Sequence, residues 1–368
     1  DKPYEIYNDT EGISMKKFMA VLLSAILSVS LFAGCSGGSG ASSSASEPAS
    51  ETQSESTEAS ESSKPATDEK TNIRVASMKG PTSIGLVKLM DDSEKGTTAN
   101  DYEFKITGTA DEIIPNLAKG ELDIAAVPAN VASVLYQKTE GDISVLAINT
   151  LGVLYLVETG DTIQSVEDLK GKTIYSTGKG TTPEYVLNYV LTANGIDPQN
   201  DLTVEYKSES TEVAALLAQE ESAIAMLPQP YVTIVQSKNE NLRVALDMTE
   251  EWDKVQSDEK SGLVTGVVVA RNEFIGNNPE ALDMFLNEYK DSAAFANDNL
   301  DESAALTEKY GIVPAAAIAK KAIPHCNITF IENGEMKEKL SGYLKALYDQ
   351  NPQAVGGTLP DDAFYFSR

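Results

Sequence analysis

Two stretches of this chain carry the same order of predicted strands and helices, 100 residues apart. Residues 72–127 alternate strand and helix patterns in the order βαβαβ, and residues 173–227 repeat that order. Identities recur at the same offset; they include Lys79-Gly80 with Lys179-Gly180, Thr82 with Thr182, Glu112 with Glu212, Ile124-Ala125 with Ile224-Ala225 and Pro128 with Pro228. Strands joined through helices pair in parallel, with right-handed crossovers. The repeat therefore predicts an α/β protein with two similar lobes, each a βαβαβ-based sheet flanked by helices.

Helix start signals follow the first strand of each copy. Thr82 or Ser83 is expected to cap a helix that runs to about residue 93, and Thr182, followed by Pro183, a helix that ends at Ala193. Residues 109–112 have the form of a capping box, which predicts a further helix ending near residue 120. These assignments place helix N-termini on the loops that follow the strands.

The loops at the carboxyl ends of the predicted parallel strands form the candidate ligand site, because open α/β sheets bind ligands just outside that edge. Two such edges facing each other would form an interlobe cleft lined by helix N-termini, whose free N–H groups suit anions and polar acceptors. The candidate ligand-binding residues are Lys79, Gly80, Pro81, Thr82, Ser83 and Asn130 in the first lobe and Lys179, Gly180, Thr181, Thr182, Gln229 and Tyr231 in the second.

Several of these residues also fit purely structural roles. Lysines are usually solvated, so Lys79 and Lys179 are expected to matter only if the ligand is an anion. Thr82 and Thr182 are expected to cap helices whether or not their hydroxyls also contact a ligand. Tyr231 also fits a position in the core. Asn130 also fits a role as the cap of the following helix, without any ligand contact.

The chain after the second copy is expected to return to the first sheet. Residues 262–270 form a continuous apolar run bounded by glycine, which is typical of a buried strand, and helices follow from Asn278 onward. We therefore predict two crossings between the lobes, near residues 156–161 and 258–263. Lobe one comprises residues 72–158 and 263–368, lobe two residues 161–262, and the two crossings form a hinge.

The first 70 residues are expected to lie outside the fold. Residues 1–14 are interpreted as a start-site extension before a secretory signal that begins at Met15 and has a 15-residue apolar run, too short to span a membrane. The run ends in residues 31–35, which resemble the lipobox of bacterial lipoproteins. Cys35 would then carry lipid such as palmitate and begin the mature chain; a plain secretory signal is the alternative. The Ser-, Ala- and Glu-rich residues 35–70 are interpreted as a disordered tether that holds the protein at the extracytoplasmic face of the cell membrane.

Composition favours binding over catalysis. A formal net charge of −27 argues against nucleic acid as a partner. One histidine, His325, and two cysteines, Cys35 and Cys326, cannot supply a zinc site of four cysteines or of two cysteines and two histidines, and a catalytic relay could only use His325. We therefore expect no enzyme activity and no cofactor. His325 and Cys326 are expected in a packed loop, and Trp252 at the surface.

Several motifs together resemble a known family. They are the lipobox and tether, Met78-Lys79-Gly80-Pro81-Thr82-Ser83, Gly120-Glu121-Leu122-Asp123-Ile124-Ala125, residues 165–172 (Ser-Val-Glu-Asp-Leu-Lys-Gly-Lys) and Pro228-Gln229-Pro230. The chain from residue 72 onward is similar to ABC-transporter solute-binding proteins of the nitrate, sulfonate and taurine type, and to binding proteins for thiamine pyrimidine precursors. The resemblance implies a two-lobed Venus-flytrap fold, the type II periplasmic binding architecture. It also implies a monomer that delivers a small solute to ABC permease subunits in the membrane.

Two other functions share these features. A sensor subunit would present the same liganded lobes to a membrane receptor. An enzyme related to thiamine-pyrimidine synthases has the same fold, but a secretion signal and the shortage of histidine and cysteine argue against it. The cleft loops contain few aromatic residues, which disfavours a sugar, and few fixed charges, so small anions (sulfonate, nitrate, taurine) and neutral polar heterocycles both remain possible.

Overall fold

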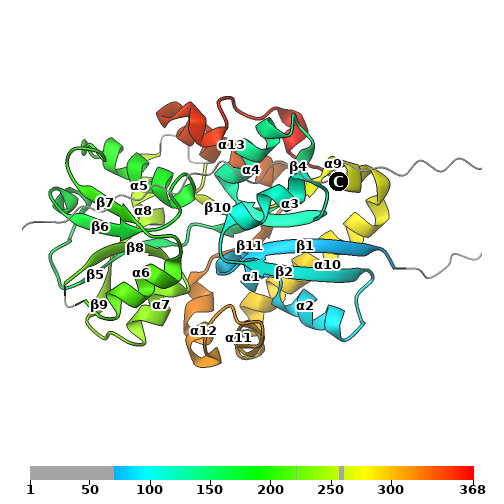
Figure 1. The fold of residues 1–368 in the computed structure, drawn as a ribbon, viewed down its shortest axis with the longest axis horizontal. Helices are drawn as coiled ribbons and strands as arrows, with labels where there is room; N and C mark the ends of the chain where they lie inside the picture. The colour runs from blue at the N-terminus through cyan, green and yellow to red at the C-terminus, as the bar shows by residue number, and fades with distance from the viewer. Residues whose placement is uncertain (1–69, 221, 257–260) are drawn as a thin grey trace, which may run out of the picture. The chain divides into compact units, whose positions relative to one another are not determined.

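The computed structural model describes residues 70–368 except 221 and 257–260. The signal sequence, the lipidation site Cys35 and the tether predicted above fall outside the described residues. The described chain contains two mixed β-sheets surrounded by helices, as Figure 1 shows. No helix in this described part is long and apolar enough to cross a membrane.

The first sheet has six strands in the order β11-β4-β10-β3-β1-β2. Its strands are β1 (Asn72–Met78), β2 (Asp101–Thr107), β3 (Ile124–Pro128), β4 (Ile143–Leu151), β10 (Val264–Arg271) and β11 (Ile328–Ile331). The second sheet has five strands in the order β7-β6-β8-β5-β9. They are β5 (Leu154–Thr159), β6 (Thr173–Ser176), β7 (Thr203–Tyr206), β8 (Ile224–Pro228) and β9 (Leu242–Asp247).

The two sheets repeat one topology, which confirms the two-lobed α/β prediction. In each sheet the first strand of the repeat lies between the other two and is parallel to both. The matching register pairs are Val75 with Phe104 and Ile124 in lobe one, and Ile174 with Val204 and Ile224 in lobe two. The offset is thus 100 for the second and third strands but 99 for the first.

Helices cover both sheets and connect the strands. Their bounds are α1 (Pro81–Ile84), α2 (Val87–Glu94), η1 (Ala110–Glu112), α3 (Ile114–Ala118), α4 (Ala129–Lys138), η2 (Val166–Leu169), α5 (Thr182–Ala193), α6 (Ser210–Leu217), α7 (Tyr231–Gln236), α8 (Met248–Val255), α9 (Asn272–Asn277), α10 (Pro279–Asp298), α11 (Leu300–Lys309), α12 (Ala316–Ala322), η3 (Ile323–His325), α13 (Asn333–Gln350), η4 (Pro352–Val355) and η5 (Asp362–Phe364).

The helix predicted to run from residue 82 or 83 to 93 is divided into α1 and α2, a difference that has a tertiary cause. In a continuous helix the Leu89 N–H would donate to the Gly85 carbonyl. Instead the Ser292 hydroxyl of α10 accepts from Leu89 N–H at 3.0 Å and donates to the Gly85 carbonyl at 2.7 Å. An inserted hydroxyl of this kind interrupts the helical hydrogen-bond ladder.

Neither Thr82 nor Thr182 caps a helix, which corrects the predicted role of both. The N-cap residues are Gly80 for α1 and Thr181 for α5, and neither makes a side-chain cap hydrogen bond. Gly80 has φ of 133°, a conformation that side chains rarely adopt. The strand-to-helix loop has two residues in lobe one, 79–80, and five in lobe two, 177–181, so Gly80 corresponds as N-cap to Thr181 and not to Gly180.

The first crossing between the lobes lies earlier than predicted. Strand β5 belongs to the second sheet, where it pairs with β8 and β9, so the chain changes sheet at Gly152–Val153 and not at residues 156–161. The sequence is apolar on both sides of Gly152–Val153, so no change of residue type marks the point at which the chain leaves the first sheet. The chain changes sheet a second time between the end of α8 and the start of β10. Lobe one therefore comprises residues 72–151 and 264–368, and lobe two residues 154–255.

Trp252 is fully buried, although a surface position was expected. It lies on α8, where its sequence neighbours are charged. The indole nevertheless packs in the core, so the polar neighbours were a poor guide to its burial. Its ring centroid is 4.4 Å from that of Tyr189 on α5 and 5.5 Å from that of Tyr343 on α13. Cys326, which follows η3, is also fully buried, and its Sγ contacts the Ala322 carbonyl oxygen at 3.2 Å.

Candidate functional site: a cleft between the lobes

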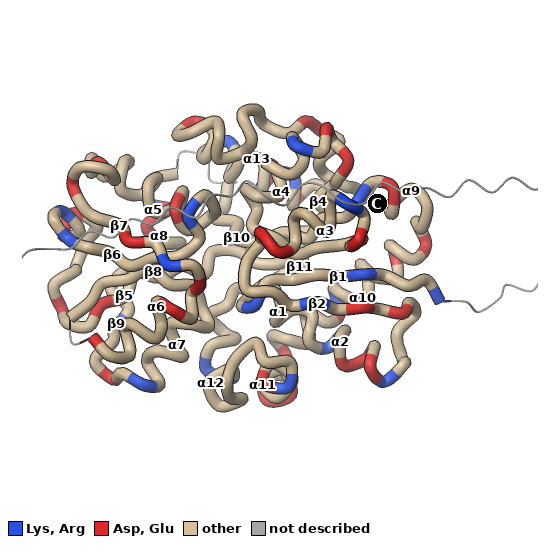
Figure 2. The backbone as a smooth tube through the Cα atoms, in the orientation of Figure 1, with Lys and Arg blue, Asp and Glu red and all other residues tan. Residues whose placement is uncertain are grey.

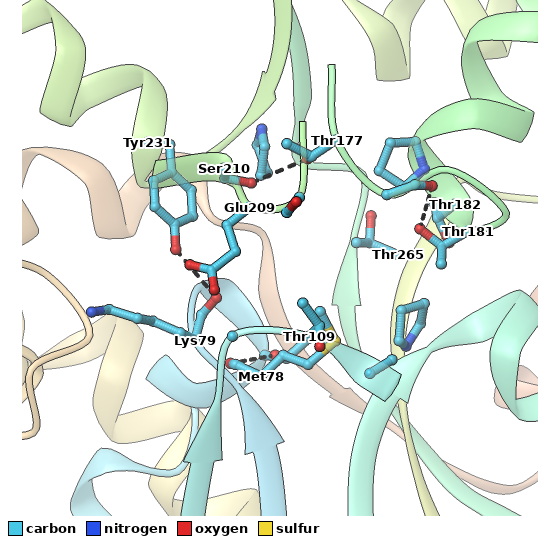
Figure 3. A pocket seen from close by; sticks show the side chains of 18 of the residues that line it. Met78, Lys79, Thr109, Thr177, Thr181, Thr182, Glu209, Ser210, Tyr231 and Thr265 are labelled. Carbon is cyan, nitrogen blue, oxygen red and sulfur yellow. Dashed lines mark hydrogen bonds between the residues drawn. The ribbon is translucent and has the colours of Figure 1, made fainter. Parts of the chain in front are cut away.

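A cavity of about 430 Å³ lies between the two lobes, at the carboxyl ends of their parallel strands. Figure 3 shows residues of lobe two facing those of lobe one across it. Lobe one contributes Met78, Lys79, Pro81, Thr82, residues 108–111, Pro128 and Thr265, and lobe two contributes Leu154, residues 177–179 and 181–183, residues 207–210, Pro228 and Tyr231. This is the sheet edge at which the sequence predicted a ligand site.

Seven of the twelve predicted residues line the cavity: Lys79, Pro81, Thr82, Lys179, Thr181, Thr182 and Tyr231. Gly80, Ser83, Asn130, Gly180 and Gln229 do not line it. Ser83 is fully buried, and its Oγ lies within hydrogen-bond distance of the Met78 carbonyl oxygen, at 2.5 Å, and of Ser77 Oγ, at 2.9 Å. Ser83 therefore holds the loop after β1 in place and does not contact the cavity.

Asn130, Gly180 and Gln229 serve other contacts. Asn130 is fully buried, and its Nδ2 donates to the carbonyl oxygens of Gly180 and Ala354, each at 3.2 Å. Gln229 lines a different cavity, and its Oε1 accepts from the N–H and hydroxyl of Thr233 at 3.2 and 2.9 Å. The loop after β8 turns the Gln229 side chain away from the cleft.

The cleft hydroxyls differ in what they can offer a ligand. Thr82 Oγ1 donates to the Met78 carbonyl at 2.9 Å, and Thr181 Oγ1 donates to the Gly178 carbonyl at 2.7 Å. Both hydrogens are therefore used within the loops, which leaves these two oxygens as acceptors. Thr182 Oγ1 instead accepts from the Tyr343 hydroxyl at 3.3 Å, so its own hydrogen is available to a ligand.

Thr265 supplies a second available hydroxyl. Its Oγ1 is buried and has no hydrogen-bond partner among the described residues, although Thr265 lines the cavity. The register between β10 and β4 shifts between Val264 and Gly266, so Thr265 is the extra residue of a bulge. Bulges commonly re-aim a side chain beside a site. Figure 3 shows Thr265 between the groups contributed by the two lobes.

Three lysines and two carboxylates give the cavity its charge. Lys179 Nζ lies 5.9 Å from the centroid of the Tyr206 ring, and Lys207 Nζ lies 3.3 Å from Glu205. In Figure 3 the Lys79 side chain extends away from the centre of the cavity. The carboxylates are Asp111 and Glu209. The described lining thus has three lysines and two carboxylates, in a chain whose acidic residues are common over both lobes in Figure 2.

Tyr231 closes one side of the cavity as a neutral phenol. Burial raises the pKa of Tyr231 to about 12, and the nearby Glu209 carboxylate adds to the shift. The phenol thus stays protonated at neutral pH, and its O–H donates to the Lys79 carbonyl oxygen at 3.5 Å. This contact joins lobe two to lobe one beside the ligand space.

Residues 108–111, residues 207–210 and Thr265 line the cavity but were not predicted from the sequence. The first two segments follow β2 and β7, so the strand-edge argument would have found them had it been applied to the second strand of each copy. No local pattern marks Thr265, whose orientation depends on the bulge. The structure groups no three metal-ligating side chains anywhere in its described residues.

Comparison with known proteins places these features in context. A family model described as "ABC transporter, phosphonate, periplasmic substrate-binding protein" matches residues 88–317, more than half of the chain.

Three solved structures share the fold. An ABC transporter protein from Parabacteroides distasonis is 24% identical, with a TM-score of 0.67 over 81% of this chain and 99% of that one. The aliphatic sulphonate binding protein of Escherichia coli is 18% identical, with a TM-score of 0.63 over 80% and 92% of the two chains. The alkanesulfonate-binding protein of Xanthomonas axonopodis pv. citri, bound to MOPS, is 14% identical, with a TM-score of 0.61 over 80% and 96%.

Proposed function

The chain belongs to the family of periplasmic substrate-binding proteins of phosphonate ABC transporters, and from this premise we propose that its interlobe cleft captures a small organic oxyanion, a phosphonate or a sulfonate. Family membership makes the chain the substrate-binding component of an ABC importer, a transport protein with an extracytoplasmic location. The proposal concerns the solute and how it is held.

The donors available in the cleft carry this proposal. Thr182 and Thr265 each present a hydroxyl hydrogen, and Lys179 and Lys207 line the same cavity. The N-terminal turns of α5 and α6 also begin at the cavity, and helix N-termini attract negative charge. Hydrogen bonds from such donors are strongest when the acceptor is an anion.

The donors come from both lobes, which links binding to closure. Thr265 belongs to lobe one, whereas Thr182, Lys179 and Lys207 belong to lobe two. A solute that accepts from both sets gains all its hydrogen bonds only when the lobes are together, so it selects the closed arrangement. The permease would recognise that arrangement.

Asp111 and Glu209 favour a solute that also has a donor group. A carboxylate in a cavity repels a simple anion, but it accepts from an ammonium or amino group. A zwitterionic solute such as taurine, or an aminoalkyl phosphonate, would satisfy both sets of charges. The same acceptors, with Thr82 and Thr181, suit the amino group of a thiamine pyrimidine precursor, which is the second candidate.

The remaining expectations are proposals that rest on the sequence. Residues 31–35 support lipidation at Cys35, which would anchor the protein as a monomer at the extracytoplasmic face of the membrane. A ligand-sensing role toward a membrane receptor would use the same cleft.

Calorimetric titration of the folded chain with methylphosphonate, 2-aminoethylphosphonate, taurine, nitrate and an aminopyrimidine tests the solute class. We expect the phosphonates or taurine to bind most tightly, and the amino-substituted phosphonate to exceed methylphosphonate. Tight binding of the pyrimidine with no binding of any oxyanion would overturn the proposal in favour of the second candidate.

A further inference from the structure

A second cavity, of about 700 Å³, lies between α7 of lobe two and the α12–η3 segment of lobe one. Helices α7 and α12 contact each other beside it, as their positions in Figure 1 also show. Its lining includes Tyr155, Gln229, Gln236, Ala317, Lys321 and His325. None of its lining residues lines the interlobe cleft, so this is a separate space.

The Gln229 amide points a donor into this cavity. Only 4% of Gln229 is exposed, and one end of its amide is fixed by the N–H of Thr233 at 3.2 Å and its hydroxyl at 2.9 Å. A backbone N–H can only donate, so the fixed end must be the oxygen, Oε1. The Nε2 end therefore faces away from Thr233, and no described residue accepts a hydrogen bond from it. This end of the amide is therefore free to donate to a molecule in the cavity.

Lys321 carries the one permanent charge among the described residues that line the cavity. His325 and Tyr155 also line it, and no carboxylate of the described residues does. Burial raises the pKa of Tyr155 to about 12, and Asp247 adds to the shift from outside the wall. Tyr155 is therefore a protonated phenol, which donates to the His325 carbonyl oxygen at 3.3 Å. In a chain of net charge −27, a cavity lined by a lysine and by no carboxylate of the described residues favours a negatively charged occupant.

We propose that the cavity between α7 and α12 is a second binding site, which takes a small oxyanion such as phosphate or a carboxylate. Gln229 provides the fixed donor at the base, and Lys321 provides the charge from the opposite wall. The bound anion joins a side chain of lobe two to one of lobe one, at a place distinct from the solute cleft. This proposal does not depend on the identity of the transported solute.

His325 gives a direct readout because it is the one histidine of the sequence. Full-length protein labelled with ¹³C at histidine Cε1 has a single imidazole signal in an NMR spectrum. We would titrate inorganic phosphate, and separately acetate, at constant pH and constant ionic strength with chloride as the balancing salt. A saturable shift of the His325 signal is expected for at least one of the two anions.

Two neighbouring lysines provide a matched pair of variants. Lys321→Glu reverses the charge in the wall, whereas Lys320→Glu makes the same change beside it, at an exposed residue paired with Asp301 that does not line the cavity. A charge-assisted hydrogen bond corresponds to about tenfold or more in affinity. Lys321→Glu and Gln229→Glu should each weaken anion binding by at least about tenfold, and Lys320→Glu by less than about twofold.

Circular dichroism would establish that each variant is folded. A shift that rises linearly with both anions and never saturates would overturn the proposal. Equal weakening by the two lysine variants would do the same, because it would show a general effect of surface charge.

Discussion

Asn130 of lobe one donates from Nδ2 to the backbone carbonyl of Gly180 in lobe two, at 3.2 Å. The same amide group donates to Ala354 at 3.2 Å, and the Asn130 side chain is fully buried. Gly180 lies between Lys179 and Thr181, two residues that line the cleft. One buried amide thus fixes the loop of lobe two that carries the candidate ligand contacts.

Asn130→Ala should lower the free energy of unfolding. The change leaves two carbonyl groups without their donor, which costs about 1–3 kcal/mol. It should also weaken solute binding, because the loop containing Lys179 is released from lobe one. Urea unfolding and calorimetry measure the two effects. Asn241→Ala, at an exposed residue of lobe two, is the control and should change neither.

Thr265→Val separates binding from stability. The Thr265 hydroxyl has no partner in the described protein, so its removal should leave the free energy of unfolding unchanged or raise it by up to about 1 kcal/mol. Solute affinity should nevertheless fall about tenfold if the ligand is an anion. Thr150→Val removes another buried hydroxyl without a described partner, outside the cleft, and should leave affinity unchanged. Equal affinity in both variants would exclude Thr265 from the site.

Thr182→Ala removes the donor that Tyr343 orients. We expect the dissociation constant to rise several-fold for a neutral solute and about tenfold or more for an anion, since the lost hydrogen bond is stronger with charge. Thr192→Ala lies on the same helix at an exposed residue and is the control. Identical calorimetric constants for the two variants would contradict the proposed contact.

The double variant Lys179→Gln, Lys207→Gln tests whether the solute is an anion. Loss of two positive charges from the cavity wall should weaken an oxyanion at least tenfold and reduce the dependence of affinity on salt. Titrations at two ionic strengths measure both quantities. Lys170→Gln, at an exposed residue beyond the other end of β6, is the control. A neutral heterocycle would bind all three proteins alike.

Acid should destabilise lobe one through Asp123. Burial acts to raise the pKa of Asp123, but hydrogen bonds from Arg74, at 2.6–3.0 Å, and from Arg271 outweigh it and lower the pKa. A lowered carboxyl pKa contributes stability above the unfolded value, near 3.9, that is lost as the pH falls through the folded value. Urea unfolding between pH 7 and pH 3 should therefore show less of this loss in Asp123→Asn than in the exposed Asp291→Asn. Parallel curves for the two variants would exclude Asp123 as the source.

The two-lobed fold could be predicted because the same βαβαβ pattern occurs twice in the sequence. Each copy contains its own strand and helix patterns, so the two copies support the same βαβαβ order independently. The first lobe boundary was wrong because apolar residues continue on both sides of Gly152. Only the pairing of β5 with β8 and β9, residues distant in sequence, shows which sheet it joins.

The candidate site was predictable as a sheet edge but less so as a set of side chains. The division of the helix after Thr82 depends on Ser292, about 200 residues away in the chain. Whether Gln229 faces the cleft depends on its hydrogen bonds to Thr233. Such contacts depend on the folded arrangement of the chain, so no local sequence pattern predicts them.

The buried Trp252 is an intrinsic fluorescence probe. It is the single tryptophan of the sequence, and its ring makes tilted contacts with Tyr189 of lobe two and with Tyr343 of the segment that returns to lobe one. The Tyr343 hydroxyl contacts Thr182 at the cleft, so a shift of Thr182 reaches the indole through one intervening residue. Intrinsic emission can therefore follow the relative movement of the lobes in unlabelled protein, with no background from a second indole.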